Sequence, residues 1–422
     1  MKNNILNIDY KKEILDNGLE VVLYKESSLP LVSVNLWYKV GSANEKPGKT
    51  GFAHLFEHMM FQGSQNIPKE MHFKYVQEAG GTLNGSTSLD RTNYYETLPS
   101  SSLELALWLE SDRMGFLLPS LTEAKLKNQK DVVMNERRQR YDNQPYGLAW
   151  EKLLSNLFNH GHPYSWPTIG WMEDIEKFNL DDVKKFFQTY YVPNNASLVI
   201  AGDIEYSETF ELVKKYFDDI PRGSEIPQIE FNNHQLKSNR IIEMEDDVHL
   251  PRIYIAWQSE KMYQSYDAAL DVLSEILSES KNSRLYKTLL FDKQIAQDVS
   301  TFQYSAKQTG MFILIATAKP NVKLEELRSS IFSEINNIIA KGITDEEMMR
   351  AINGIKSSYI YSLQKQAVLA DQLNNYNCNL GEPNSFIFDI ERYESVTKDL
   401  VCDAAEKFLL QPNVELRITP KK

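Results

Sequence analysis

The sequence predicts an α+β fold built from two copies of one domain, and three observations lead to this prediction. The chain has 422 residues, well above the roughly 150 residues of one typical domain. Strand-like and helix-like segments alternate in both halves. The end of the first half, residues 181–204, resembles the end of the second, residues 398–420, and both contain a Pro-Asn pair at the matching place. A period of roughly 200 residues favours duplicated domains over a solenoid, whose repeats span ~20–50 residues, the alternative being chance similarity of amphipathic helices.

The first half is expected to begin with a β-hairpin. Residues 19–41 contain two stretches rich in β-branched and aromatic residues, LEVVLYKE and LVSVNLWYKVG, separated by Ser-Ser-Leu-Pro. Helical patterns follow at 51–62 and 69–79, and glycine ends each of them. A long strand-like stretch then covers 82–99. The other elements expected in this half are helices at 102–118, 122–141, 181–191 and 207–217 and a strand at 197–204.

A linker is expected between the two copies at residues 221–240, which are polar and contain Pro, Gly and Asn throughout. We therefore expect a first domain over residues 1–220 and a second domain over residues 241–422. The elements expected in the second copy are strands at 252–258 and 311–318 and helices at 267–280, 323–340 and 344–363.

The composition excludes several classes of protein. Hydrophobic residues at 42 % and charged residues at 25 % are typical of a globular chain, and a net charge of −12 argues against a general nucleic-acid binder. No apolar run approaches the ~18 residues of a membrane span, and the first residues lack the apolar core of a signal peptide. Two cysteines, Cys378 and Cys402, cannot form a disulfide framework and are expected to be free thiols. A cytoplasmic location is expected, or a periplasmic one if a signal peptide was removed before the numbering begins.

Two of the seven histidines, His54 and His58, are four residues apart in the sequence HLFEH. On a helix, residues i and i+4 lie above one another on one face, so the two imidazoles can converge on one zinc ion. Glu57 borders that face and is placed to take a proton from a water molecule activated by the metal. The spelling HxxEH is the inverted form of the HExxH motif of zinc proteases. The alternative is an amphipathic surface helix with two incidental histidines.

Zinc hydrolase sites use three protein ligands, so a third ligand is expected on another element. Glu136 is a candidate because it shares a helical stripe with Gln129 and the two valines Val132 and Val133, and a carboxylate on the inner face of a helix is costly unless it is paired or binds a metal. A salt bridge from Glu136 to Arg140 is the alternative.

Other metal-ligand candidates are weaker. His160 and His162 lie in a loop with Pro and Gly, where an i, i+2 pair is expected to be simply exposed. Together with Glu96, they are the residues to consider if Glu136 is not the third ligand.

Here the residues resemble a known family. HLFEHMMFQGS, followed after 77 residues by the glutamate of VVMNERRQ, resembles the pitrilysin/insulinase metallopeptidases, and most of all their processing-peptidase-like bacterial members. The resemblance covers the whole chain, HPYSWPTIG included, and implies two homologous α+β domains, each a mostly antiparallel β-sheet with helices packed on it. It implies a zinc-dependent endopeptidase with one Zn²⁺ per chain, in which His54, His58 and Glu136 are the ligands and Glu57 is the general base.

The same resemblance implies how a substrate is held. Residues 82–97 correspond to an edge strand, to which a peptide or an unfolded segment adds as a further β-strand in an enclosed cleft. The residues expected to bind substrate there are Asn84, Gly85, Ser86 and Thr87.

Three positions depart from the family's pattern. Gln129 stands where many relatives carry a glutamate seven residues before the third ligand. Leu290 and Gln297 stand where many relatives carry an Arg and a Tyr that grip the substrate. The second half also lacks an HxxEH motif and is therefore expected to be structural. We expect a dimer, and favour a heterodimer in which a homologous subunit supplies the Arg/Tyr pair.

Three alternatives follow from these departures. Arg284, Tyr286 or Tyr304 could supply the grip from within the chain. The chain could also be a catalytically weak or non-catalytic core or assembly subunit of the same family, although such subunits typically have lost part of the motif or the third ligand. A metal-binding protein without hydrolase activity would not need Glu57.

Overall fold

The computed structural model describes residues 6, 8–231 and 235–421, which form two compact units. The first unit consists of Met1–Arg137, Trp166–Glu230 and Ile360–Ile387. The second unit consists of Arg138–Ser165, Phe231–Tyr359 and Phe388–Lys422.

Relative to the domain boundaries expected from the sequence, two segments are exchanged. Residues 138–165 belong to the second unit, and residues 360–387 belong to the first. Of the expected linker at 221–240, residues 232–234 lie outside the described part of the chain, and the described residues before Arg240 form no helix or strand.

The first unit contains a six-stranded sheet with the order β1-β2-β6-β3-β5-β4, so that β1 and β4 are its two edges. Only β2 and β6 run parallel, and every other neighbouring pair is antiparallel. The strands are β1 (Tyr10–Ile14), β2 (Glu20–Lys25), β3 (Leu31–Tyr38), β4 (Thr82–Thr87), β5 (Thr92–Pro99) and β6 (Ala196–Gly202).

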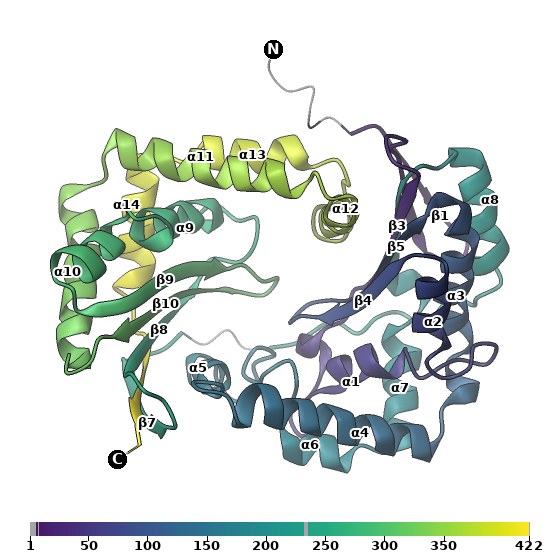
Figure 1. Ribbon diagram of the computed structural model, residues 1–422, viewed down its shortest axis with the longest axis horizontal. Coiled ribbons are helices and arrows are strands. Elements are labelled where there is room, and N and C mark those ends of the chain that lie inside the picture. Colours follow the sequence, from purple (N-terminus) through teal and green to yellow (C-terminus); the bar gives the residue numbers. More distant parts are fainter. Residues whose placement is uncertain (1–5, 7, 232–234, 422) are drawn as a thin grey trace. The chain divides into compact units, whose positions relative to one another are not determined.

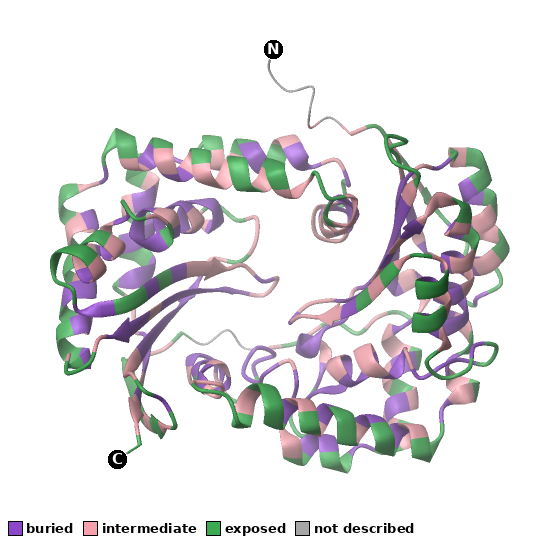
Figure 2. Ribbon diagram, in the orientation of Figure 1, coloured by how far each residue is buried: buried purple, intermediate pink, exposed green. Residues whose placement is uncertain are grey.

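The prediction of a β-hairpin at residues 19–41 is wrong. Both strands form, but β6 lies between them, parallel to β2 and antiparallel to β3. All seven residues of β6 are buried, and an apolar strand without alternation is suited to the centre of a sheet rather than to its edge. Buried residues, purple in Figure 2, gather along the strands of both sheets. The stretch at 82–99 is instead the hairpin, formed by β4 and β5.

The second unit contains a five-stranded sheet with the order β7-β11-β8-β10-β9. Its strands are β7 (Arg240–Asp246), β8 (Arg252–Ser259), β9 (Ala296–Tyr304), β10 (Gly310–Ala318) and β11 (Val414–Pro420). Taken in chain order, they match β2 to β6 in position and in direction, including one parallel pair, β7 with β11. The prediction of two homologous α+β domains with mostly antiparallel sheets is confirmed.

Helices pack on both sheets (Figure 1). Those of the first unit are α1 (Phe52–Met59), α2 (Met71–Glu78), α3 (Leu103–Phe116), α4 (Glu123–Arg137), α6 (Met172–Lys177), α7 (Leu180–Tyr190), α8 (Tyr206–Phe217) and α12 (Gln366–Leu380). The helix expected at 122–141 is α4 followed by a π-helical turn, Arg138–Asp142.

The exchanged helix α12 is fixed to the first sheet by hydrogen bonds. It packs on β6 and β3. Asp371 Oδ1 accepts hydrogen bonds from Asn35 Nδ2 at 3.0 Å, Trp37 Nε1 at 2.8 Å and Asn93 Nδ2 at 3.0 Å. One carboxylate therefore satisfies polar groups of two neighbouring strands.

In the second unit, the exchanged helix is α5 (Ala149–Leu157), which packs on β11 and β8. Its Leu157 carbonyl oxygen accepts a hydrogen bond from Gln258 Nε2 at 3.0 Å. The other α-helices after residue 240, apart from α12, are α9 (Asp267–Ser274), α10 (Leu324–Lys341), α11 (Asp345–Ser362), α13 (Phe386–Glu394) and α14 (Lys398–Leu409). Both cysteines are free thiols, as expected.

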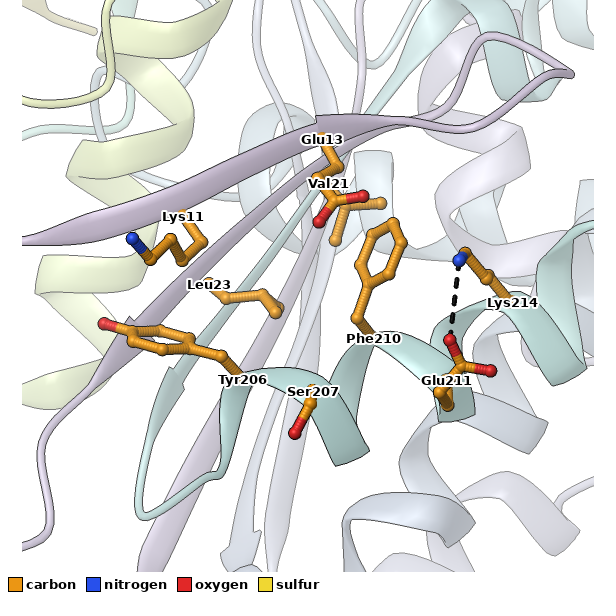
Figure 3. Close-up of a pocket in the computed structure, with 9 residues that line it drawn as sticks. All are labelled: Lys11, Glu13, Val21, Leu23, Tyr206, Ser207, Phe210, Glu211 and Lys214. Carbon is orange, nitrogen blue, oxygen red and sulfur yellow. Dashed lines mark hydrogen bonds and ion pairs between the residues drawn. The ribbon is translucent and has the colours of Figure 1, made fainter.

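A shallow groove lies over β1 and β2, bordered by α8 (Figure 3). Val21, Leu23 and Phe210 form its apolar lining, and Lys11 and Lys214 add charge. The groove is at the opposite edge of the sheet from β4, and its lining contains none of the site residues predicted from the sequence. Across the described ranges, no helix is long and apolar enough to cross a membrane.

Candidate metal centre

Helix α1 separates apolar from polar residues. Phe52, Leu55, Phe56 and Met59 follow the i, i+3, i+4, i+7 pattern and are buried, which anchors one face of the helix in the core. The residues of the HxxEH motif are half-buried on the other side. The rings of its two histidines have their centroids 4.9 Å apart. The apolar face thus anchors the helix in the core, and both imidazoles lie on the opposite face.

Helix α4 lies beside α1 and brings Glu136 to these imidazoles (Figure 1). Glu136 Oε2 is 3.1 Å from His58 Nε2 and 3.8 Å from His54 Nε2. One ligand atom from each of the three residues lies within 4.8 Å of the others, and this is the only such grouping found in the described part of the chain. The side chains are 13 %, 26 % and 16 % exposed for His54, His58 and Glu136, which leaves the grouping accessible to solvent.

The donor set fits a zinc ion. Two imidazole nitrogens and one carboxylate oxygen are the ligands found in many zinc hydrolases, with a fourth position open to water or substrate. Two ligands that are each ~2.1 Å from one tetrahedral ion are separated by about 3.4 Å. The separations of 3.1 and 3.8 Å between Glu136 Oε2 and the two imidazole nitrogens lie on either side of that value, and all three ligand atoms are within 4.8 Å of one another.

Glu57 is adjacent to the grouping but is bonded elsewhere. Its Oε2 accepts a hydrogen bond from Thr87 Oγ1 at 2.6 Å. Burial raises the pKa of the Glu57 carboxyl, and the Thr87 hydroxyl and the neighbouring His58 oppose that shift. A Cβ atom at Gly85 would lie 3.2 Å from Glu57 Cγ, so the glycine leaves space beside the carboxylate.

The four residues expected to bind substrate all lie on β4, with different surroundings. Asn84 is exposed and its Oδ1 accepts a hydrogen bond from the Gly85 N–H at 2.9 Å, whereas Gly85 is buried. Ser86 Oγ donates to Asn93 Oδ1 at 2.7 Å, and Thr87 donates to Glu57. The side chains of Ser86 and Thr87 are therefore engaged within the first unit.

Two residues outside the predicted metal site support α1. Tyr94 is buried in β5, and its hydroxyl donates to the Phe56 carbonyl oxygen at 3.0 Å. Glu45 is buried and accepts hydrogen bonds from the first N–H groups of the helix. Neither has a motif of its own, and only the fold brings them to α1.

The weaker metal-ligand candidates lie outside the grouping. His160 is exposed, as expected, but His162 is buried, stacked on Phe158 with its Nδ1 accepting from the Tyr164 N–H at 3.1 Å. Burial lowers the pKa of His162 to about 4, as for a core histidine. Glu96 is buried in β5.

The positions that depart from the family's pattern lie in different surroundings. Gln129 is buried on α4 and donates to Asn128 Oδ1 at 3.2 Å. In the second unit, Leu290 packs against the hydrophobic core and Gln297 is exposed on β9. Arg284 forms two hydrogen bonds with the Glu347 carboxylate, at 2.7 and 2.8 Å, which occupies the guanidinium within that unit.

Comparisons with known proteins identify the family of the chain. The family model described as "Insulinase (Peptidase family M16)" matches residues 20–169, and the one described as "Peptidase M16 inactive domain" matches residues 177–355. The chain is similar to the zinc protease PqqE of Helicobacter pylori, with 32 % identity over 366 residues, which cover 86 % of this chain and 82 % of that protein. The chain belongs to the M16 family of peptidases.

Two further M16 relatives cover nearly all of the chain. The crystal structure of a protease from Helicobacter pylori matches with a TM-score of 0.92 and 29 % identity, covering 98 % of this chain and all of that one. A probable mitochondrial-processing peptidase subunit beta of Arabidopsis thaliana is 24 % identical over 427 residues, covering 98 % of this chain and 79 % of that protein. The structural match agrees with the two-domain fold, and the M16 assignment agrees with the resemblance seen in the sequence.

Proposed function

We propose that this chain is a zinc-dependent endopeptidase that hydrolyses peptides or unfolded segments of proteins. The supporting observation is the approach of His54, His58 and Glu136 to within 4.8 Å, with Glu57 on the same helix as the two histidines. This combination provides a metal-ligand set and a separate carboxylate for proton transfer. The names of the M16 relatives, which include zinc proteases, are consistent with it.

In this proposal three residues bind the metal and a fourth transfers the proton. The two imidazoles and the Glu136 carboxylate hold the zinc ion, which when bound polarises a water molecule and the peptide carbonyl. Glu57 removes a proton from the attacking water and then donates it to the amine that leaves. The Thr87 hydroxyl bonds to Glu57 Oε2, so Oε1 is the oxygen available to accept that proton.

The substrate is proposed to bind as an added strand on β4. Among the strands described, β4 pairs only with β5, so its other edge presents backbone N–H and C=O groups. Thr87 and Gly85 place this strand directly against Glu57. Backbone pairing would hold a peptide in extended form with little dependence on its sequence.

We further propose that the chain acts in a dimer, as a heterodimer with a homologous subunit that carries the Arg/Tyr grip. Leu290 and Gln297 cannot provide such a grip, and Arg284 is engaged by Glu347. The similar Arabidopsis protein is named as a subunit.

A second candidate is a catalytically weak or non-catalytic core subunit of the same family. The observation that favours it is the match of residues 177–355 to a domain described as inactive. That match begins at residue 177, however, after all of the proposed metal ligands.

One experiment tests the proposed function. The purified chain is analysed for zinc by elemental analysis and for cleavage of an unfolded protein and of fluorogenic peptides. We expect one zinc ion per chain, loss of cleavage with a chelator and recovery when zinc is restored. A metal-free chain that cleaves as fast as the zinc-loaded one would contradict the proposal, and zinc binding without any cleavage, alone or with a partner, would support the core-subunit alternative.

A further inference from the structure

The candidate zinc ligands lie on two helices, α1 and α4, and residues 166–174 contact both of them. We propose that this segment, which we call the brace, fixes α4 relative to α1 and thereby sets the affinity of the metal site. The inference rests on the metal site proposed above. Three sets of side-chain contacts and one close approach of two backbones, all within the first unit, support it.

The first contact holds the start of α1. The helix begins after Gly51, which has no side chain to cap it, and Glu45 takes that role by accepting hydrogen bonds from the N–H groups of Gly51 and Ala53, both at 2.8 Å. Trp166, the first residue of the brace, donates its indole N–H to Glu45 Oε2 at 3.1 Å. The capping carboxylate is thus itself held by the brace, and the residue after Ala53 is the first candidate ligand.

The second contact comes from the other end of the brace. Asp174 is buried, and its Oδ2 accepts hydrogen bonds from the Thr50 N–H at 3.1 Å and the Thr50 hydroxyl at 2.7 Å. The hydroxyl oxygen in turn accepts a hydrogen bond from the Trp171 N–H at 3.0 Å. The residue before Gly51 is therefore bonded by two residues of the brace.

Between these ends, the two backbones approach so closely that glycine is required on both sides. Gly51 and Gly170 have φ values of +97° and +82°, which favour glycine. A Cβ atom at Gly170 would be 2.4 Å from the Thr50 carbonyl oxygen, and one at Gly51 would be 2.7 Å from the Ile169 carbonyl oxygen. The start of α1 therefore rests directly on the brace.

The third contact joins the brace to α4. Arg137 follows Glu136, and its Nη1 donates a hydrogen bond to the Gly170 carbonyl oxygen at 3.2 Å. The Arg137 guanidinium also lies over the Trp171 ring, with Cζ 5.7 Å from its centre. Gly170 thus touches the start of α1 with its Cα and the end of α4 with its carbonyl group.

These contacts have a direct consequence for metal binding. Two ligands on one helix and a third on another form a preorganised set only while the helices keep their separation. Outer residues that orient ligands typically change metal affinity by roughly 10–100-fold when they are removed. Arg137 and Asp174 are therefore positioning residues of the zinc site, although neither can reach the metal grouping as a ligand.

The test measures zinc affinity directly, by competition with a coloured chelator, in variants whose folding is checked by circular dichroism. Arg137→Met and Asp174→Leu remove the two sets of bonds, and Arg137→Lys and Asp174→Asn retain part of them. Lys127→Ala on α4 and Glu173→Gln on α6 are matched controls, because both side chains are exposed.

We expect roughly 10–100-fold weaker zinc binding in Arg137→Met and Asp174→Leu, partial recovery in the conservative variants and no change in the controls. The double variant should lose less than the product of the single effects, because either change already releases the brace. Cobalt(II) in place of zinc provides a second measurement, since its visible spectrum reports the ligand geometry.

If Asp174→Leu does not fold, Arg137→Met decides the question, because it leaves the buried carboxylate in place. A folded Arg137→Met chain that binds zinc as tightly as the wild type would overturn the inference. A wild-type chain that binds no zinc would overturn the proposed metal site as well, whereas wild-type binding with unchanged variants would overturn the brace alone.

Discussion

The Thr87 hydroxyl donates a 2.6 Å hydrogen bond to Glu57 Oε2, which joins the edge strand β4 to the helix that carries the two histidines. The strand that is proposed to hold the peptide therefore also orients Glu57, the carboxylate that is proposed to take a proton from the attacking water. A peptide that pairs with β4 would approach Glu57 from the strand that fixes it.

Replacing Glu57 with Gln should abolish hydrolysis and preserve zinc binding. The amide cannot accept a proton from water, while both histidines and Glu136 remain. Loss of a general base costs on the order of 10²–10⁴ in rate. Zinc content and peptide cleavage are measured on the same preparation, and full activity would refute the role of Glu57.

Thr87→Val should lower kcat about tenfold with little change in KM, because it removes a hydrogen bond to a charged group worth about 1.5 kcal/mol. Thr87→Ser keeps the hydroxyl and should recover most of the rate. Thr82→Val, at an exposed position of the same strand, is the matched control. An unchanged kcat in Thr87→Val would show that the hydroxyl does not matter.

Glu136→Gln should weaken zinc binding, because a neutral amide oxygen does not balance the charge of the metal. Glu123→Gln, an exposed change on the same helix, should bind zinc as the wild type does. Zinc stoichiometry at low free zinc checks this prediction. An unchanged stoichiometry in Glu136→Gln would mean that another residue is the third ligand.

Arg284→Met should destabilise the second unit by about 2 kcal/mol, since it breaks two charge-assisted hydrogen bonds, and should not change KM for peptides. The Arg284 guanidinium lowers the pKa of Glu347 from its ordinary value of 4.5 to about 2. A lowered carboxyl pKa stabilises the fold above about pH 4.5 and loses that effect as the pH falls towards 2.

The difference in urea unfolding between wild type and Arg284→Met should therefore shrink as the pH falls from 5 to about 2. Lys287→Met, at an exposed nearby position, should unfold as the wild type does at each pH. A large rise in KM with unchanged stability would instead identify Arg284 as the internal grip.

The chain alone should cleave a fluorogenic peptide slowly, and a homologous subunit with the Arg/Tyr pair should raise the rate. Positioning of the substrate can contribute several kcal/mol to lowering a reaction barrier, and Leu290 and Gln297 cannot supply it. Turnover and mass by light scattering are measured for the chain alone and for the co-expressed pair. Fast turnover by the chain alone would show that no partner is needed.

The sequence predicts local features of this fold better than long-range ones. The spacing of His54, Glu57 and His58 and the apolar pattern around them are sufficient to predict α1, since both depend only on helix geometry. Glu136 could be selected from its helical stripe. Its contact with the histidines, however, depends on the packing of α4 against α1.

The remaining features depend on contacts between distant residues. The insertion of β6 between β2 and β3 joins residues that are more than 150 positions apart, which no local pattern encodes. The role of Glu45 is also invisible in the sequence, because a glutamate in a stretch with Lys, Pro and Gly resembles any surface loop. The exchange of residues 138–165 and 360–387 between the two units also depends on contacts between distant residues, so no local pattern predicts it.

The exchange also affects how the chain is made. On the ribosome, β3 and β6 emerge well before residues 366–380, so for part of synthesis both strands exist without α12, the helix that packs on them. Until Asp371 is synthesised, its carboxylate is not there to accept the hydrogen bonds of Asn35, Trp37 and Asn93. A nascent chain that stops after residue 220 would expose the sheet face that α12 covers in the complete chain to chaperones and proteases. The two halves of this duplicated protein are therefore expected to mature together, at the end of translation, and not one after the other.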